Sequence, residues 1–257
     1  MLKLFLAELR RSWIMSIRYP VQSIGRIFVF ASIFYGLFLS SRYVAGDAFQ
    51  LGDRLDSIII GYVLWTLTSF ILASLAGELQ IEAQTGTLEQ LFLSRYGATK
   101  VFLMRMLADL SLQIVQIFTI LVIIMILTGS RLNFPPTLLL PFVTVVLGAN
   151  GFAFALGSLS LIFKRLQELL GVTQFPLLFL LTIPTENWIG SARILAALLP
   201  MTPGAELLRD VMARGESLNL TKLLIAFING TVYFAVGLWI FRQAEGKAKQ
   251  QGILRGY

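Results

Sequence analysis

The stretch FLMRMLADLSLQIVQIFTILVIIMILT, residues 102–128, decides the fold. Its charged residues, Arg105 and Asp109, lie in its first third, and every later side chain is apolar or uncharged. About 20 consecutive, mostly apolar residues are enough for a helix to cross the hydrocarbon core of a bilayer. The stretch therefore predicts a membrane-spanning helix.

Other apolar stretches recur along the chain, and no long polar stretch separates them. They predict an all-α integral membrane protein with a single transmembrane domain, residues 1–257, and six transmembrane helices. The predicted spans are residues 22–39, 58–76, 102–128, 138–163, 169–183 and 223–241. The first contains Arg26 and the fifth is short, so the ends of these two are the least sharply marked.

The composition agrees with a membrane protein. The chain is 56% hydrophobic and 14% charged, whereas soluble domains are about 45–50% apolar and about 25% charged. The net charge of +7 comes from lysines and arginines that flank apolar runs, so we expect membrane lipids as partners and no nucleic acid. Cysteine and histidine are both absent, which excludes disulfides, thiolate metal sites and histidine proton relays.

The distribution of basic residues predicts the orientation. About two thirds of the 21 lysines and arginines lie beside one set of span ends, and cytoplasmic loops retain such residues. Both termini are therefore expected in the cytoplasm, with the chain in the inner or plasma membrane. The N-terminus lacks the separate regions of a cleavable signal peptide.

Residues 2–18 precede the first span and carry apolar side chains at helical spacing, including Trp13. They predict an amphipathic helix in the cytoplasmic interface, although an extension of the first spanning helix is an alternative. Residues 184–222, on the outside, are too apolar for a simple loop. They predict a re-entrant or surface-lying hairpin of two short helices, residues 188–199 and 204–212, separated by Pro200 and Pro203.

The cytoplasmic loop after the second span reads ELQIEAQTGTLEQLFLSRYGATK, residues 78–100. Thr87 followed by Gln90 forms a capping box, so a helix is expected to begin there, after a turn at Gly86. The helix would place apolar side chains on one face and acidic groups beside them, which suits docking in a groove of another protein. An ordinary amphipathic loop helix is the alternative.

The segment EAQTGTLEQLFLSRYG, residues 82–97, resembles the coupling helix of the ABC transporter type-2 permease family. The order of elements is also similar to that of the family: interfacial helix, two spans, coupling helix, three spans, outside hairpin and last span. The stretch LLPMTPGAELLRDVMARG, residues 198–215, resembles the segment of the family before its final helix. The resemblance covers nearly the whole chain.

This resemblance implies an exporter in which two permease subunits, identical or similar, enclose a pathway powered by two cytoplasmic ABC ATPase subunits. The ATP and magnesium would be bound by the ATPase subunits, because this chain has no GxxxxGK[ST] phosphate loop and is not an enzyme by itself. The coupling helix, residues 82–95, would be the docking site. Its expected docking residues are Glu82, Gly86, Thr87, Leu88, Glu89, Gln90, Leu91 and Phe92.

Polar groups inside spans are costly, so each is first considered as functional. The candidate pathway-lining residues are Gln113, Gln116, Asn150, Gln174, Asn229 and Glu186. The alternative for the amides is hydrogen bonding between packed helices, which we favour. Glu186 is more simply a solvated loop charge.

Four other features of the spans are interpreted as structural. Arg26 is expected to extend to the cytoplasmic head groups. Arg105 and Asp109, four residues apart, are expected to pair with each other. The small residues Ala149, Ala153 and Gly157 permit close helix packing, and Pro176 can kink the fifth span.

An ATP-independent secondary transporter is one rival function, and a structural membrane subunit is another. The first would need acidic or histidine groups at mid-membrane or an inverted repeat, and the spans show neither, apart from Asp109 near an inner end. An intramembrane enzyme would need a catalytic constellation that cannot be assembled here. We therefore expect an exporter of an amphipathic small molecule, drug or lipid.

Overall fold

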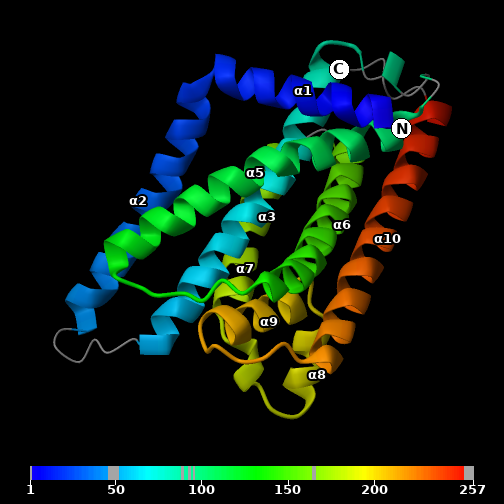
Figure 1. Ribbon diagram of the computed structural model, residues 1–257. Coiled ribbons are helices and arrows are strands. Elements are labelled where there is room, and N and C mark those ends of the chain that lie inside the picture. Colours follow the sequence, from blue (N-terminus) through cyan, green and yellow to red (C-terminus); the bar gives the residue numbers. More distant parts are fainter. Residues whose placement is uncertain are drawn as a thin grey trace.

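The computed structural model describes residues 2–45, 52–87, 90–91, 94, 96–163 and 166–251. Within these residues the protein has nine α-helices and no strand (Figure 1). The helices are α1 (Leu2–Arg18), α2 (Pro20–Ala45), α3 (Gly52–Gln84), α5 (Ala98–Thr128), α6 (Leu139–Phe163), α7 (Leu166–Thr182), α8 (Ser191–Leu198), α9 (Thr202–Met212) and α10 (Leu220–Gln251). Short 3-10 helices occupy Pro136–Leu138 and Thr185–Asn187.

Five of the described helices are long and apolar enough to cross a membrane. These candidate spans are Pro20–Tyr43, Leu55–Glu82, Ala98–Thr128, Pro136–Leu159 and Leu220–Lys247. The remaining predicted span, residues 169–183, falls on α7, whose apolar part is Leu170–Thr182 and contains Pro176. This part is shorter than the roughly 20 residues that a bilayer needs. The structure thus supports five of the six predicted spans by length, and the sixth remains a prediction.

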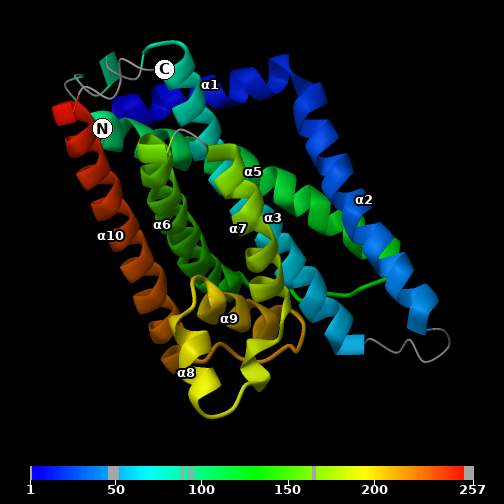
Figure 2. The same cartoon turned by 180° about the vertical axis from the view of Figure 1, so that it is seen from behind.

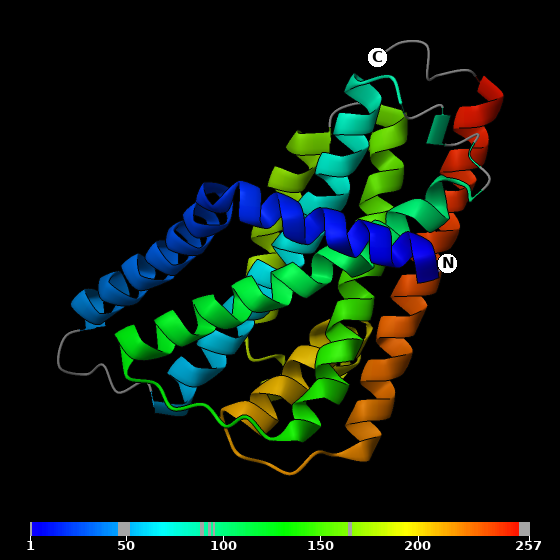
Figure 3. The same ribbon diagram turned by 45° about the horizontal axis from the view of Figure 1, so that its top comes forward.

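The N-terminal helix is separate from the first span. α1 ends at Arg18, and Pro20 begins α2, as proline commonly does at the first position of a helix. Figures 1 and 3 show α1 and α2 meeting at a corner, with α1 lying across the end of the bundle. The alternative that residues 2–18 extend the first span is therefore wrong.

Helix α3 is the centre of the bundle. In the most apolar part of its span, 83% of the residues are buried, whereas the corresponding share is 11% in α2 and 22% in α10. α3 packs against α5, α6, α7 and α9, and α2 lies at the edge of the molecule beside α5 (Figure 2). Aromatic contacts join α2 to α3, with Phe30 near Trp65 and Phe70, and Phe34 near Tyr62.

The predicted outside hairpin contains helices at both expected positions, α8 and α9, joined by a turn in which Met201 has a φ of 63°. Every residue of α9 is buried. It packs against α3, α6 and α10, so α9 does not lie on the surface of the protein. Asn229 of α10 holds the end of α8, because its Nδ2 donates to the carbonyls of Ala197 and Leu199.

Helices α6 and α10 run side by side and approach closely at glycines. A Cβ on Gly237 would lie 1.9 Å from the carbonyl oxygen of Gly151, and a Cβ on Gly230 would lie 2.5 Å from that of Thr144. The predicted small-residue stripe serves a different contact, because Gly157 packs against Leu75 of α3. Both contacts lie inside one chain.

We expect Gly237→Ala to destabilise the protein by about 1–3 kcal/mol, since the new methyl group meets backbone that cannot move aside. Thermal or chemical unfolding of the purified chain in detergent would measure this. Gly246→Ala, on the same helix with nothing within 4 Å of its Cβ position, is the matched control. It should leave stability unchanged or raise it, because alanine favours helix more than glycine does. Equal stability of the two variants would contradict the close approach.

Candidate functional site

The predicted coupling segment lies at the end of the bundle that carries α1. We call this the α1 end, which the sequence predicts to be cytoplasmic. α3 finishes at Gln84, and a turn follows in which Gly86 has a φ of 69°. The hydroxyl of Thr87 then donates to Glu82 Oε2 at 2.5 Å. The loop is therefore tied back to the last turn of the helix from which it emerges.

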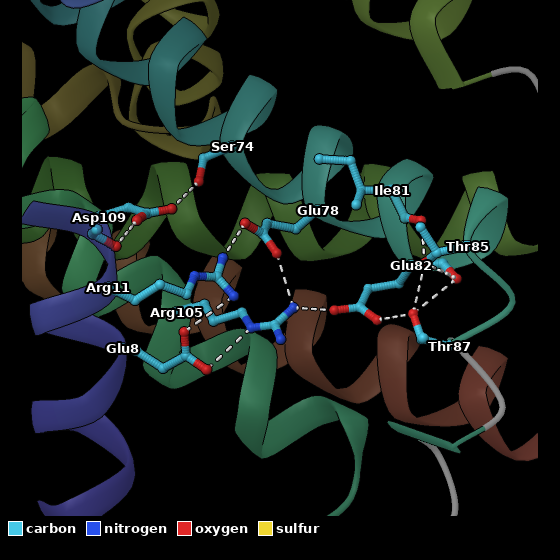
Figure 4. A network of polar contacts seen from close by, with 11 residues as sticks. Glu8, Arg11, Ser74, Glu78, Ile81, Glu82, Thr85, Thr87, Arg105 and Asp109 are labelled. Carbon is cyan, nitrogen blue, oxygen red and sulfur yellow. Dashed lines mark hydrogen bonds and ion pairs between the residues drawn. The ribbon is translucent and has the colours of Figure 1, made fainter. Parts of the chain in front are cut away.

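Arg105, near the start of α5, is the centre of an ion-pair network at this end (Figure 4). Its Nη1 lies 2.6 Å from Glu82 and 2.8 Å from Glu78, both on α3, and its Nε lies 3.2 Å from Glu8 on α1. Arg11 of α1 also bonds Glu78, at 2.5 Å. The side chain of Arg105 is 11% exposed. One guanidinium thus joins α1, α3 and α5 beneath the loop.

The predicted pairing of Arg105 with Asp109 is wrong. Asp109 instead accepts hydrogen bonds from Ser12 of α1 at 2.5 Å and Ser74 of α3 at 2.6 Å. The reason is tertiary: α1 and α3 pack on the face of α5 that carries both charges, and their polar groups reach Arg105 and Asp109 first.

The other end of the loop is held by α10. Glu245 Oε2 accepts hydrogen bonds from the Thr99 hydroxyl at 2.5 Å and the Thr99 N–H at 3.3 Å. Gly97, with a φ of 73°, makes the turn into α5. The carboxylate therefore satisfies a free N–H in the first turn of α5, where an anion is also favoured by the helix dipole. The segment from Thr87 to Gly97 is fixed at both ends.

The expected docking residues have different places in this arrangement. Gly86 and Gln90 are exposed, Thr87 and Leu91 are half-buried, and the Leu91 N–H bonds the Thr87 carbonyl at 3.0 Å, as in a helical turn. The Thr87 hydroxyl donates to Glu82, which differs from the predicted capping box, where it would accept the Gln90 N–H. Leu88, Glu89 and Phe92 lie outside the described residues.

A second charged cluster surrounds α9 at the opposite end of the molecule. Glu186 bonds Arg209 at 3.0 Å and Arg214 at 2.5 Å. Glu206 accepts two bonds from Arg193, and Lys222 lies 3.0 Å from Glu206. The remaining links join Asp210 to Arg214 and Lys222. Glu186 is only 7% exposed, so its interpretation as a solvated loop charge is wrong.

Sequence reasoning missed Arg209, which is fully buried and also donates to the Leu181 carbonyl at 2.9 Å. The available signal was the spacing of Glu206, Arg209 and Asp210 in a segment already considered too apolar for a loop. Three charges within one short apolar helix indicate partners elsewhere in the chain, because unpaired charges are not buried.

These partners shift the pKa of two carboxyl groups outside the spans. Burial disfavours the charged forms of Glu186 and Glu206, but Arg209 and Arg214 outweigh this effect at Glu186, and Arg193 and Lys222 outweigh it at Glu206. The pKa of each is lowered from the ordinary value of 4.5. Each ionised carboxylate therefore stabilises the folded state above that value.

We expect this stabilisation to be complete near neutral pH, to decline as the pH falls through about 4.5, and to disappear once both folded carboxyls are protonated. Unfolding of the purified chain between pH 7 and pH 3 would measure it. In Glu186→Gln with Glu206→Gln, the loss of stability over this range should be smaller than in wild type. An equally steep loss in both proteins would contradict the assignment.

The candidate pathway-lining amides do not form one group. Asn150 donates to the Val146 carbonyl within its own helix, and Asn229 holds α8 as described above. The main-chain carbonyl of Gln174 accepts a hydrogen bond from Trp65 Nε1. Gln113 and Gln116, on α5, line a polar cavity near the α1 end. Among the described residues, no group of three or more acidic side chains could hold a metal ion.

The comparisons with known proteins identify the family of the chain. The model of the ABC-2 type transporter family matches residues 3–213, which extend from α1 through α9 and include the Arg105 network and the α9 cluster except Arg214 and Lys222. No curated protein matches the chain. ABC-2 permeases generally pair with ABC ATPase subunits, where ATP hydrolysis takes place. Since the family match covers most of the chain, this multi-pass protein belongs to the ABC-2 type transporter family as a membrane-spanning permease subunit.

Proposed function

We propose that this chain is the permease of an ATP-driven exporter and that the loop between α3 and α5 receives motion from the ATPase. The observation that supports this proposal is the attachment of the loop at both ends, through Thr87 to Glu82 and through Thr99 to Glu245. A loop attached in this way moves together with the helix ends that hold it.

The ion pairs extend this coupling to other helices. Arg105 joins the last turns of α3 to α1 and α5, and Glu245 joins α5 to α10. A displacement of the loop would therefore act on four helices together. ATP binding would favour one arrangement only if the ATPase pair contacts the two arrangements differently.

The topology proposed for this function has six spans, with α7 as the fifth and α8–α9 as a re-entrant hairpin on the outside. The predominance of lysine and arginine beside the α1 end supports cytoplasmic termini in the inner or plasma membrane. A second permease subunit, identical or similar, would complete the pathway, and two ATPase subunits would dock on the pair. The proposed substrate is an amphipathic small molecule, drug or lipid.

Photo-crosslinking tests the docking site. A photoreactive amino acid in place of Gln90, which is exposed in the loop, should capture an ATPase subunit in membranes from the native cell. The same amino acid in place of Glu216, exposed at the opposite end, is the matched control and should not. Leu88→Arg combined with Glu89→Arg should abolish both capture and co-purification. Capture only from the Glu216 position, or an ATPase retained by the double variant, would contradict the proposal.

A further inference from the structure

A polar cavity of about 700 Å³ lies between α1, α2, α3 and α5, next to the Arg105 network. Its lining includes serines from α1, α2 and α3, two glutamines from α5, and charged groups from all four helices, among them the paired Arg11, Glu78 and Glu82 of the network. The polar lining residues used below are Ser12, Ser23, Arg26, Ser74, Asp109, Gln113 and Gln116. All lie on or against helices long and apolar enough to span a membrane.

Two opposite charges in this cavity, Arg26 and Asp109, attract each other without a direct ion pair. Arg26 is exposed, and its guanidinium lies 5.5 Å from the centre of the Phe70 ring. Among the described residues, no carboxylate lies within ion-pair distance of it, and its expected extension to the head groups stays a prediction. Asp109 accepts hydrogen bonds from two serine hydroxyls. Among the described residues, no cation forms an ion pair with it. An ionisable group within a span indicates function unless a partner explains it.

The two glutamines add hydrogen-bond acceptors. Gln113 is 5% exposed and Gln116 is 6% exposed. Each donates through Nε2, to the Phe70 carbonyl and the Ser23 hydroxyl respectively, and each Oε1 has no partner in the described structure. Buried acceptors without donors are unfavourable. A ligand that brings N–H groups beside Asp109 would satisfy them.

The surroundings of the cavity are apolar. Three of the residues that line it, Met15, Tyr19 and Ile81, are exposed. These side chains border the cavity at its exposed edge. A ligand in the cavity could therefore extend hydrocarbon chains along this surface.

We propose that the cavity binds the zwitterionic head group of an amphiphile with a phosphate and a primary ammonium. The Arg26 guanidinium bonds the phosphate, since it presents paired N–H donors to phosphate oxygens. The ammonium lies beside Asp109 and donates to it and to the amide oxygens of the two glutamines. The apolar chains leave the cavity past Met15, Tyr19 and Ile81. This site is a property of the chain alone and does not depend on the proposed ATPase partner.

Direct lipid binding tests the proposal. The purified chain in detergent would be titrated with phosphatidylethanolamine carrying a fluorophore on an acyl chain, so that the head group stays free. Binding should be stronger than that of phosphatidylglycerol, which lacks the ammonium, and of phosphatidylcholine, whose ammonium has no N–H. Soluble glycerophosphoethanolamine should compete only weakly, because it lacks the chains. Equal binding of the three lipids, or strong competition by the soluble compound, would overturn the proposal.

Substitutions of the charged residues that line the cavity test whether the lipid binds there. Arg26→Gln and Asp109→Asn should each weaken binding of phosphatidylethanolamine about tenfold or more, as expected for loss of one charge-assisted contact. Arg26→Lys should retain part of the affinity. Arg42→Gln, which removes an exposed arginine from the far end of the same helix, is the control and should bind like wild type. Unchanged binding by Arg26→Gln, or the same loss in the control, would overturn the proposal without affecting the ATPase experiment.

Discussion

Replacing Arg209 with methionine is expected to lower the free energy of unfolding by about 3–5 kcal/mol, the cost of removing one partner from a buried ion pair. The Arg209 side chain is 0% exposed and bonds both Glu186 and the Leu181 carbonyl. Methionine keeps the length and apolar stem, but it leaves both acceptors without this donor. Chemical unfolding of the purified chain in mixed micelles would measure the loss.

Two further variants separate the charge from the volume. Arg209→Met combined with Glu186→Gln removes the carboxylate as well as the cation, so part of the lost stability should return. Arg193→Gln removes a cation that is 39% exposed in the same cluster, and it should cost about 0–1 kcal/mol, as exposed pairs usually do. If Arg209→Met were as stable as wild type, the buried pair would not hold α9 in place.

The spans were predictable because each is a continuous apolar stretch, a property that the sequence displays directly. The two helices of the outside hairpin were also predictable, since Pro200 and Pro203 mark the break between them. α7 differs: its described apolar part is too short to satisfy the length criterion, so the sequence and the structure leave its role as a span to be inferred.

The polar partners were not predictable, because they lie far apart in the chain. The spacing of four residues predicted a pair between Arg105 and Asp109. In the structure, Arg105 instead bonds Glu8, which lies 97 positions away in the sequence. The same limit applies to α9. The spacing of its charges in an apolar segment indicates partners elsewhere, but only the packing of α3, α6 and α10 around it shows which groups these are.

The sequence predicts where the candidate site lies, and the contacts that hold the loop could not be predicted from it. The loop after the second span was identified from its turn, its expected cap and its resemblance to a family. The clamp between Thr99 and Glu245 joins positions 146 residues apart, and no local pattern marks such a contact. Glu82 was expected to face a partner protein, and its carboxylate lies between Thr87 and Arg105. Its role in docking remains a prediction.

Arg105→Gln is expected to uncouple the exporter while leaving the ATPase bound. The variant leaves Glu8, Glu78 and Glu82 close together with Arg11 as their remaining cation in the network. We expect a loss of about 3 kcal/mol in stability and of most substrate-dependent ATP hydrolysis in the assembled complex. ATPase activity in nanodiscs, measured with and without substrate, and co-purification of the ATPase would report the two effects.

Lys100→Gln is the matched control, because it removes one exposed basic residue from the first turn of the same helix. It should behave as wild type in both measurements. Arg105→Lys keeps the charge but cannot bond three carboxylates with a planar fork, so it should fall between wild type and Arg105→Gln. Loss of ATPase binding in Arg105→Gln would show instead that the network shapes the docking surface.

A double variant separates coupling from stability. Arg105→Gln combined with Glu78→Gln removes one of the carboxylates left without its partner, so repulsion falls and part of the stability should return. The connection from the loop to α1 and α5 stays broken, because Arg105 supplies its bonds to both Glu8 and Glu82. ATP hydrolysis should therefore remain insensitive to substrate in a protein that again folds well. Recovery of substrate stimulation together with stability would show that the network only holds the helices together, and that the loop transmits motion by another route.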